Sequence, residues 1–141
     1  MTTPRIIQLP KILDHRGNLS VIEELKEIPF AIRRAYWVYD VPGGEDREGH
    51  AYHRNEEFIV ALSGSFDVCV ELPDGTNKKF SLNRGYYGLY VPRLHWRVLT
   101  NFSTNSLALV LASTPYDEND YILTFDKFKE LSNEVRNKQQ Q

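Results

Sequence analysis

The sequence predicts an all-β protein of two packed antiparallel sheets, with one short helix near the C-terminus. Short runs rich in β-branched and aromatic residues alternate with turn-forming segments at close spacing. The run at residues 66–72 alternates apolar and polar side chains, so it predicts a strand with one packed face. The run LALVLA at residues 107–112 is apolar at every position, which predicts a strand covered on both sides, as two packed sheets require.

Nine β-rich runs precede the helix in chain order. They cover residues 5–9, 18–24, 33–41, 56–64, 65–73, 78–83, 86–91, 95–102 and 106–113. Turn-forming segments lie at residues 14–18, 42–49, 73–76, 83–85 and 103–106. In the third of these segments, Asp74 and Gly75 are expected to form a tight hairpin turn.

The helix is expected at residues 126–138, because Phe125, Phe128, Leu131 and Val135 fall on one helical face. The polar end of the chain, about residues 132–141, is expected to fray. The sequence shows no internal repeat and no linker, so we expect residues 1–141 to form a single domain.

The composition narrows the classes of function. The formal net charge is −2 and the basic residues are scattered, which disfavours DNA, RNA and anionic membranes as partners. The single cysteine, Cys69, excludes an internal disulfide, and the apolar run around it predicts a buried, inert thiol. The chain has neither a signal-peptide pattern nor the roughly 20 apolar residues that a membrane helix needs, so a cytoplasmic location is expected.

The stretch GHAYHRNEEF, at residues 49–58, carries the densest chemistry in the chain. Two histidines and a carboxylate this close together suggest a metal site or a metal-free acid–base pocket. Residues two apart on an extended strand face the same way, so His50 and Tyr52 share a face and His53 points away from it. His53 and Arg54 are therefore expected at the surface.

The spacing in this stretch resembles the first cupin motif, in which a His-x-His pair is followed by Glu and then Gly. His50, Glu57 and Gly64 match that motif, whereas Tyr52 stands in place of the second histidine. The motif is therefore only partly kept.

The second cupin motif, which runs from Gly through Pro to His and Asn, is approximated by Gly85, Pro92 and Asn101. Arg97 stands where that motif has its histidine. Cupin metal sites use these imidazoles, and a guanidinium stays charged and does not ligate divalent ions. We therefore expect no metal site.

Longer stretches extend the resemblance. The chain resembles the WxcM-like sugar-nucleotide 3,4-ketoisomerases, which are cupins that act on dTDP-4-keto-6-deoxyglucose. The matching stretches are DHRGNLSVIEE, IPFAIRRAYWVYDVPGG, REGHAYHR, ALSGSF, GLYVPRLHWR and STPYDENDYILTFDKF. They follow the order and spacing of the family, and the last of them is the most specific.

The resemblance implies a cupin jelly roll and a homodimer, often with exchange of N-terminal strands. It implies isomerisation of a dTDP-linked 4-keto-6-deoxy sugar with no metal or other cofactor, in deoxyamino-sugar biosynthesis for surface polysaccharide. The family uses two histidines in a His-Ala-His sequence; His50 carries over as the first, and Tyr52 replaces the second. Arg16 matches the arginine of the family's Asp-x-Arg-Gly sequence and is expected to bind substrate.

A 3,4-ketoisomerase needs a base near neutral pKa, a second proton-transfer group and a donor that stabilises the enolate oxygen. His50 fits the base, because an ordinary imidazole titrates near pH ~6.5. Arg97 is expected to hold the enolate oxygen. The second proton-transfer group is either Tyr52 or His95, which has the same strand parity as Arg97.

The remaining polar residues of these stretches are expected to bind or to position. Arg34 and Arg47 are expected to contact the diphosphate, and Tyr36 is placed at the pocket by its position in the family pattern. Glu57 is expected either to orient His50 or Arg97 or to form a buried ion pair. The acidic residues Asp117, Glu118 and Asp120 are expected to act in turns and helix capping.

Three other functions stay open at this point. An epimerase of the same keto sugars would use the same proton abstraction. A non-catalytic sugar-nucleotide-binding cupin would follow if the loss of the second family histidine at Tyr52 abolished turnover. A metal-dependent cupin is disfavoured by Tyr52 and Arg97.

Overall fold

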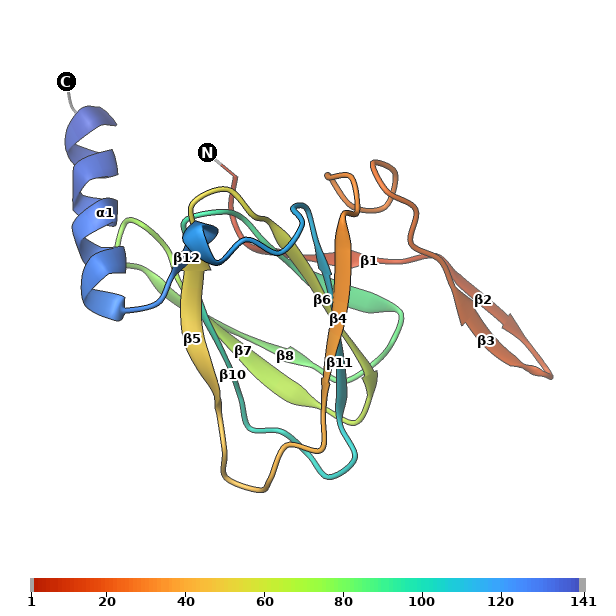
Figure 1. Ribbon diagram of the computed structural model, residues 1–141. Helices are drawn as coiled ribbons and strands as arrows, with labels where there is room; N and C mark the ends of the chain where they lie inside the picture. Colours follow the sequence, from red (N-terminus) through yellow and green to blue (C-terminus); the bar gives the residue numbers. More distant parts are fainter. Residues whose placement is uncertain (1, 140–141) are drawn as a thin grey trace.

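The computed structural model describes residues 2–139, apart from the side chains of Glu48 and Gln139 (Figure 1). Two five-stranded antiparallel sheets make up the body, as predicted. The first sheet has the order β1 (Arg5–Gln8), β9 (Tyr87–Val91), β6 (Glu57–Ser63), β11 (Leu107–Ala112) and β4 (Arg34–Tyr39). The second has the order β12 (Tyr121–Ile122), β5 (Arg47–Tyr52), β10 (Trp96–Thr100), β7 (Phe66–Glu71) and β8 (Asn77–Leu82).

The main core lies between the two sheets. It joins residues of the first sheet, such as Ile59 and Val110, to residues of the second, such as Val68 and Leu99. A second buried cluster covers the outer face of the first sheet, where residues 9, 28 and 30 pack on β6, β9 and Leu111. Strand β11 is therefore covered on both sides, which confirms the prediction from its sequence.

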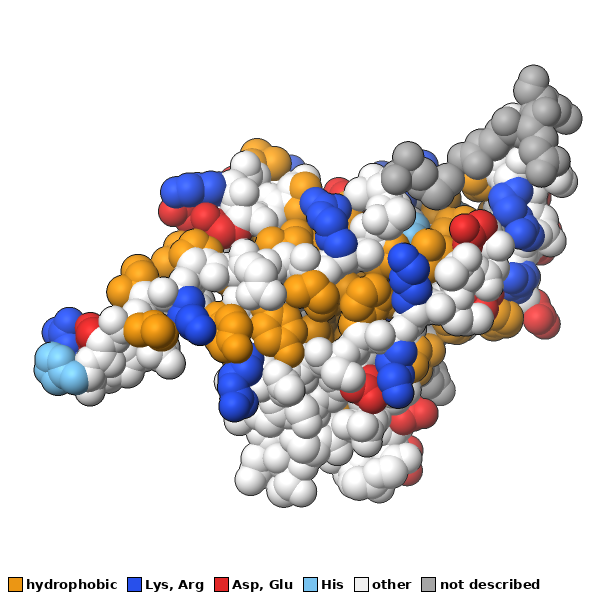
Figure 2. All heavy atoms as spheres, turned by 180° about the vertical axis from the view of Figure 1, so that it is seen from behind, with side chains coloured by type: hydrophobic (Ala, Val, Ile, Leu, Met, Phe, Trp, Pro, Cys, Tyr) orange, Lys and Arg blue, Asp and Glu red, His pale blue; other side chains and the backbone are white. Residues whose placement is uncertain are grey.

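A two-stranded hairpin, β2 (Lys11–Asp14) and β3 (Gly17–Ser20), projects away from the body (Figure 1). All of its residues are exposed, including the apolar Ile12, Leu13 and Leu19. Seen from behind, an apolar band continues from this hairpin onto the body (Figure 2). An isolated two-stranded hairpin is only marginally stable in water.

The C-terminal helix α1 (Phe125–Gln139) follows a short 3₁₀ turn, η1 (Glu118–Asp120). Phe128 is buried against Ala51 and Ile122, with Trp96 and Leu131 beside it. Fraying of about residues 132–141 stays a prediction: the helix continues to Gln139, and residues 140–141 lie outside the described range. Ser132 is buried and donates a hydrogen bond to the carbonyl of Phe128, and Arg136 donates one to the carbonyl of Asp74.

Two further expectations need correction. Strand β5 begins at Arg47, inside the segment that the sequence assigned to a turn, because pairing with β10 overrides the weak strand propensity of Glu and Gly there. Cys69 is half-buried rather than buried, since it lies on the polar face of β7, where its Sγ is 3.9 Å from the hydroxyl of Thr100. The tight turn at Asp74 and Gly75 is confirmed, with Gly75 at a φ of 91°.

No helix among residues 2–139 is long and apolar enough to cross a membrane.

Candidate active site

A cavity of about 560 Å³ opens at one end of the space between the sheets. Strands β4, β5, β10 and β11 line it, together with the segment that leads into η1. Its lining residues are Arg34, Tyr36, Val38, Asp46, Arg47, His50, Arg97, Leu99, Val110, Tyr116 and Tyr121. Five of the nine residues that the sequence assigned to the site are therefore in its wall: Arg34, Tyr36, Arg47, His50 and Arg97.

A buried carboxylate, Glu57 at the start of β6, organises the inner wall of the cavity. Its Oε1 accepts a hydrogen bond from Arg97 Nε at 2.9 Å, and its Oε2 accepts one from Arg97 Nη2 at 3.2 Å. The hydroxyls of Tyr36 and Tyr52 also donate to Oε2, at 2.5 and 3.2 Å. Arg97 Nη2 donates in addition to the hydroxyl of Tyr36 at 2.8 Å. The Glu57 and Arg97 side chains are 1% and 4% exposed, so both charges are neutralised inside the protein.

These contacts shift the pKa values of the whole group. Burial alone would raise the pKa of Glu57, but the charge of Arg97 and the hydrogen bonds from Arg97 and Tyr36 outweigh it, so the pKa is lowered. Burial raises the pKa of the phenols of Tyr36 and Tyr52, and the negative charge of Glu57 raises both further. Glu57 is therefore ionised at neutral pH, and both tyrosines are protonated.

His50 meets this network through Tyr52, as strand parity predicted. His50 Nε2 and the hydroxyl of Tyr52 are 2.9 Å apart, and the two rings meet edge to face. The ring of Tyr121 lies against both, with centroids 5.3 Å from His50 and 4.7 Å from Tyr52. Because Tyr52 donates to the ionised Glu57, its oxygen is placed to accept a hydrogen bond from His50 Nε2.

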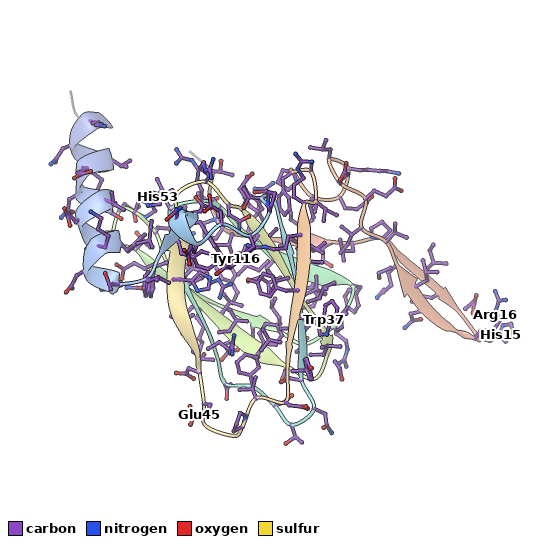
Figure 3. All side chains as sticks on the ribbon, viewed as in Figure 1. His15, Arg16, Trp37, Glu45, His53 and Tyr116 are labelled. Carbon is purple, nitrogen blue, oxygen red and sulfur yellow. The ribbon has the colours of Figure 1, made fainter. Side chains whose placement is uncertain are left out.

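Basic and aromatic groups alternate at the mouth of the cavity. The guanidinium carbon of Arg34 is 5.6 Å from the ring centroids of both Tyr36 and Tyr116. Tyr116 is 68% exposed and lines the cavity, on the segment that leads into η1 (Figure 3). Among the described residues, Arg34 Nε is buried and has no hydrogen-bond partner. This arrangement can receive an anionic ligand with a planar aromatic group.

Two residues that the sequence assigned to the site lie elsewhere. Arg16 is at the tip of the projecting hairpin, where it pairs with Asp14 and is well separated from Tyr116 (Figure 3). His95 is buried on another side of the molecule, in a cavity of about 350 Å³ lined by Pro73, Pro92 and Val135 among others. Its Nδ1 is 2.9 Å from the carbonyl oxygen of Arg93, and burial lowers its pKa.

The acidic residues near the C-terminus hold the chain beside the site, broadly as expected. Asp117 caps η1 by accepting a hydrogen bond from the amide of Asn119. The carboxylate of Asp120 accepts hydrogen bonds from the amides of Arg54 and Asn55. It thereby ties the turn after β5 to the segment that carries Tyr121.

A second tie joins the same turn to the end of β11. The side-chain oxygen of Asn55 accepts hydrogen bonds from the amides and hydroxyls of Ser113 and Thr114. His53 is exposed between these ties and points away from the cavity, as parity predicted (Figure 3).

Among the side chains that the structure describes, which exclude that of Glu48, no three His, Cys, Asp or Glu lie close enough together to bind one metal ion. The expectation that the protein acts without a metal rests on Tyr52 and Arg97, and it stays a prediction.

The sequence of this chain matches the model of a known protein family. The family model described as FdtA: WxcM-like, C-terminal matches residues 2–133.

The chain belongs to this family.

WxcM-like relatives match it along most of its length. The TDP-4-oxo-6-deoxy-alpha-D-glucose-3,4-oxoisomerase of Aneurinibacillus thermoaerophilus is 41% identical over 126 residues, which are 89% of each chain. QdtA, a sugar 3,4-ketoisomerase of Thermoanaerobacterium thermosaccharolyticum solved in complex with TDP, has a TM-score of 0.90 at 32% identity, covering 94% of this chain and 96% of that one. The WlaRB TDP-quinovose 3,4-ketoisomerase of Campylobacter jejuni has a TM-score of 0.87 at 36% identity, covering 92% and 99%. The predicted family and jelly-roll fold are confirmed.

Sequence reasoning on this WxcM-like protein missed Asp46, Tyr116 and Tyr121 as lining residues. The two tyrosines fall within STPYDENDYILTFDKF, the stretch most specific to the family. The position of both tyrosines in this family-specific stretch was the signal that could have identified them. Strand alternation could not have done so, because neither tyrosine lies in a run with a clear strand pattern.

Proposed function

We propose that this protein is a sugar-nucleotide 3,4-ketoisomerase that converts TDP-4-keto-6-deoxyglucose into a 3-keto sugar nucleotide. The observation that carries the proposal is the pairing of His50 with Tyr52 beside the Glu57–Arg97 pair, at the wall of a cavity large enough for a ligand. It stands in a chain that is 41% identical to a 3,4-oxoisomerase.

In the first step of the proposed reaction, His50 removes the proton on C3, which the ketone at C4 makes acidic. The electron pair of the C3–H bond forms the C3–C4 double bond, and the electrons of the ketone move to O4. Arg97 lines the cavity, and its Nη1 donates no hydrogen bond to the described residues. This nitrogen is the donor that stabilises the negative charge on O4.

In the second step, Tyr52 gives its hydroxyl proton to C4, and the His50 imidazolium returns a proton to Tyr52 across the 2.9 Å contact. The hydroxyl proton on O3 passes to O4, so the ketone ends at C3 and no atom is gained or lost. The raised pKa of Tyr52 keeps its hydroxyl protonated at neutral pH, so it enters this step with a proton to give, and the His50 imidazolium replaces that proton. His95 is the weaker alternative, because it lines a different cavity.

Glu57 acts in this scheme through its neighbours. It accepts hydrogen bonds from Tyr52 and Arg97 rather than from His50, so it fixes the proton donor and the oxyanion donor in place. The sequence left two roles open for Glu57, which were to orient His50 or Arg97 and to form a buried ion pair. The position of Glu57 fits both roles.

Arg34 and Arg47 bind the diphosphate in this proposal, since both line the cavity and a guanidinium matches phosphate oxygens in pairs. Tyr36 has a double role, because its hydroxyl contacts Glu57 and Arg97 while its ring faces Arg34.

We further propose a homodimer in which the hairpin β2–β3 of one chain lies on the body of the other. The hairpin exposes Ile12, Leu13 and Leu19, and the outer face of the edge strand β4 exposes Trp37 and Tyr39. Burial of such apolar surfaces in a second copy would stabilise both. Arg16, which is remote from the cavity of its own chain, would then reach the substrate in the partner.

The test is to incubate the protein, treated with EDTA, with TDP-4-keto-6-deoxyglucose in deuterated water and to follow the sugar by NMR. A 3-keto product with deuterium at C4 supports the proposal, and His50→Asn is the inactive control. Exchange at C3 or C5 with inversion would instead identify an epimerase, which has less support because the relatives described above are ketoisomerases. Saturable binding without exchange would identify a non-catalytic binding protein.

The cytoplasmic location and the link to surface polysaccharide stay predictions. Cell fractionation tests the first, and analysis of surface sugars in a deletion strain tests the second.

A further inference from the structure

The strand that carries His50 contains a β-bulge next to the catalytic histidine. Arg97 pairs with His50, but Leu99, two residues further along β10, pairs with Arg47. Residues 48 and 49 of β5 therefore stand opposite the single residue Val98. A bulge adds one residue to a strand and changes the direction of the side chains beyond it.

The bulge explains a feature that strand alternation does not. Arg47 and His50 are three residues apart, so a regular strand would turn them to opposite faces. Both line the same cavity instead, together with their pairing partners Arg97 and Leu99. The extra residue thus brings a phosphate-binding candidate and the base to one face.

Gly49 leaves the space that this bulge needs. A Cβ atom at this position would lie 2.5 Å from Nε1 and 2.7 Å from Cε2 of Trp96, and 2.7 Å from Cγ2 of Val98. Gly49 is not among the glycines with positive φ, so its backbone conformation is open to other residues. The requirement for glycine here is steric, because Trp96 and Val98 lie directly against the backbone.

Trp96 cannot move aside easily, because α1 holds it from the other side. Its ring centroid is 5.6 Å from that of Phe125 and 5.9 Å from that of Phe128. Phe128 is fully buried. The indole therefore lies between the C-terminal helix and the bulge.

We infer that Gly49 and Trp96 are positioning residues for catalysis: the indole packed on Gly49 fixes the bulge that turns both Arg47 and His50 into the cavity. This inference rests on the proposed function for its kinetic consequence, but its geometric part, the placement of Arg47 and His50, does not depend on that function. A displacement of about 1 Å at a catalytic group costs on the order of 10²-fold in rate.

The experiment compares Gly49→Ala with Gly43→Ala, whose added Cβ would contact nothing within 4 Å in the neighbouring loop. The readouts are kcat, thermal stability and the Cε1–Hε1 NMR signal of His50, assigned by its loss in His50→Asn. The chain has only four histidines, so the signals of His15 and His53 serve as internal references. We expect Gly49→Ala to displace the His50 signal alone and to lower kcat about 10²-fold, while Gly43→Ala resembles the wild type.

Trp96→Phe combined with Val98→Ala removes bulk on the side where the added Cβ clashes. In this background, adding Gly49→Ala is expected to cause little further change, so that the His50 signal and kcat stay close to those of the background that keeps Gly49. A folded Gly49→Ala protein with an unchanged His50 signal would overturn the inference, as would an equally large displacement when Gly49→Ala is added to the background.

If the Gly49→Ala protein does not fold, the single variant Trp96→Phe tests the inference instead. It keeps the glycine but loosens the bulge, so the His50 signal is expected to move with little change in melting temperature; an unmoved signal contradicts the inference. If the wild type shows no turnover, the proposed function fails while the NMR comparison still tests the positioning.

Discussion

At the scale of single residues, the two histidines of GHAYHR lie in opposite environments. His50 meets Tyr52 in the cavity, whereas His53 is exposed on the far side of the turn. We expect His50→Asn to lower kcat by about 10²–10⁴-fold with TDP binding and stability nearly unchanged, and His53→Asn to change little. Steady-state kinetics and a thermal melt with TDP check both. An inactive His53→Asn protein would show that the strand register is wrong.

The second proton-transfer group is tested by Tyr52→Phe against His95→Asn. Tyr52 contacts His50 directly, so removal of its hydroxyl is expected to lower kcat about 10²-fold or more without a matching rise in KM. His95→Asn is expected to keep kcat, because His95 lies outside the cavity. Equal losses in the two variants would contradict the assignment.

The buried ion pair gives a prediction about stability. Glu57→Gln leaves the Arg97 charge buried without its partner, so the free energy of unfolding is expected to fall by about 3–5 kcal/mol. Removing both charges, in Glu57→Gln with Arg97→Gln, is expected to recover part of that loss. Urea denaturation measures the two variants, and an additive loss in the double variant would show that the pair is not coupled.

Residue-scale reasoning from the sequence was right where a strand was regular. Parity placed His50 and Tyr52 together, because both follow the bulge within β5. His53 is exposed as expected, but it lies just beyond the last residue of that strand. Parity failed for His95, because alternation holds only within a strand and β10 begins at Trp96. Strand alternation could not identify Tyr121 as a site residue, since its contact with Tyr52 depends on pairing between strands β12 and β5, which are far apart in the chain.

At the scale of elements, the junction between α1 and the β7–β8 hairpin contains a pH-sensitive group. Burial lowers the pKa of His95 below its ordinary value of 6.5, against smaller opposing effects of the Arg93 carbonyl and the charge of Asp74. The unfolded chain therefore takes up a proton before the folded one as the pH falls. Stability is complete above about pH 6.5 and is lost as the pH falls toward the folded-state pKa.

We expect the free energy of unfolding to decrease between pH 7 and 5, with a slope of at most about 1.4 kcal/mol per pH unit from this group. His95→Gln is expected to flatten that slope, and exposed His53→Gln is the matched control. Denaturant titrations at several pH values give the slopes. The same slope in all three proteins would exclude His95 as the cause.

The succession of strands along the chain was more predictable than the residues at which each strand begins and ends. The runs at residues 65–73 and 106–113 correspond to β7 and β11, because the apolar positions of each run match the sides on which the strand is buried. The first residues of β5, from Arg47 to Gly49, were missed, since Glu and Gly have weak strand propensity and the neighbour β10 imposes the extended form there. The bulge could not be foreseen, because it depends on which residue of β10 each residue of β5 meets.

At the scale of the whole molecule, the remote position of Arg16 makes assembly part of the proposed site. We expect Arg16→Ala and His50→Asn homodimers to be nearly inactive. After the two are mixed and allowed to exchange chains, activity is expected to return to roughly a quarter of the wild-type value, since half of the dimers are mixed and each has one intact site of two. No recovery, despite exchange shown by native mass spectrometry, would place Arg16 in the site of its own chain or outside both.

The ties made by Asn55 and Asp120 have a consequence for the thermodynamics of binding. They hold the turn after β5, the end of β11 and the segment with Tyr121 in one arrangement. The carboxylate of Glu57 is already satisfied by Arg97, Tyr36 and Tyr52. A ligand therefore meets a wall that has little conformational freedom left to lose. The entropic penalty of ordering falls mainly on the exposed ring of Tyr116 and on the ligand itself, so the heat capacity change of binding should reflect buried apolar surface rather than coupled folding.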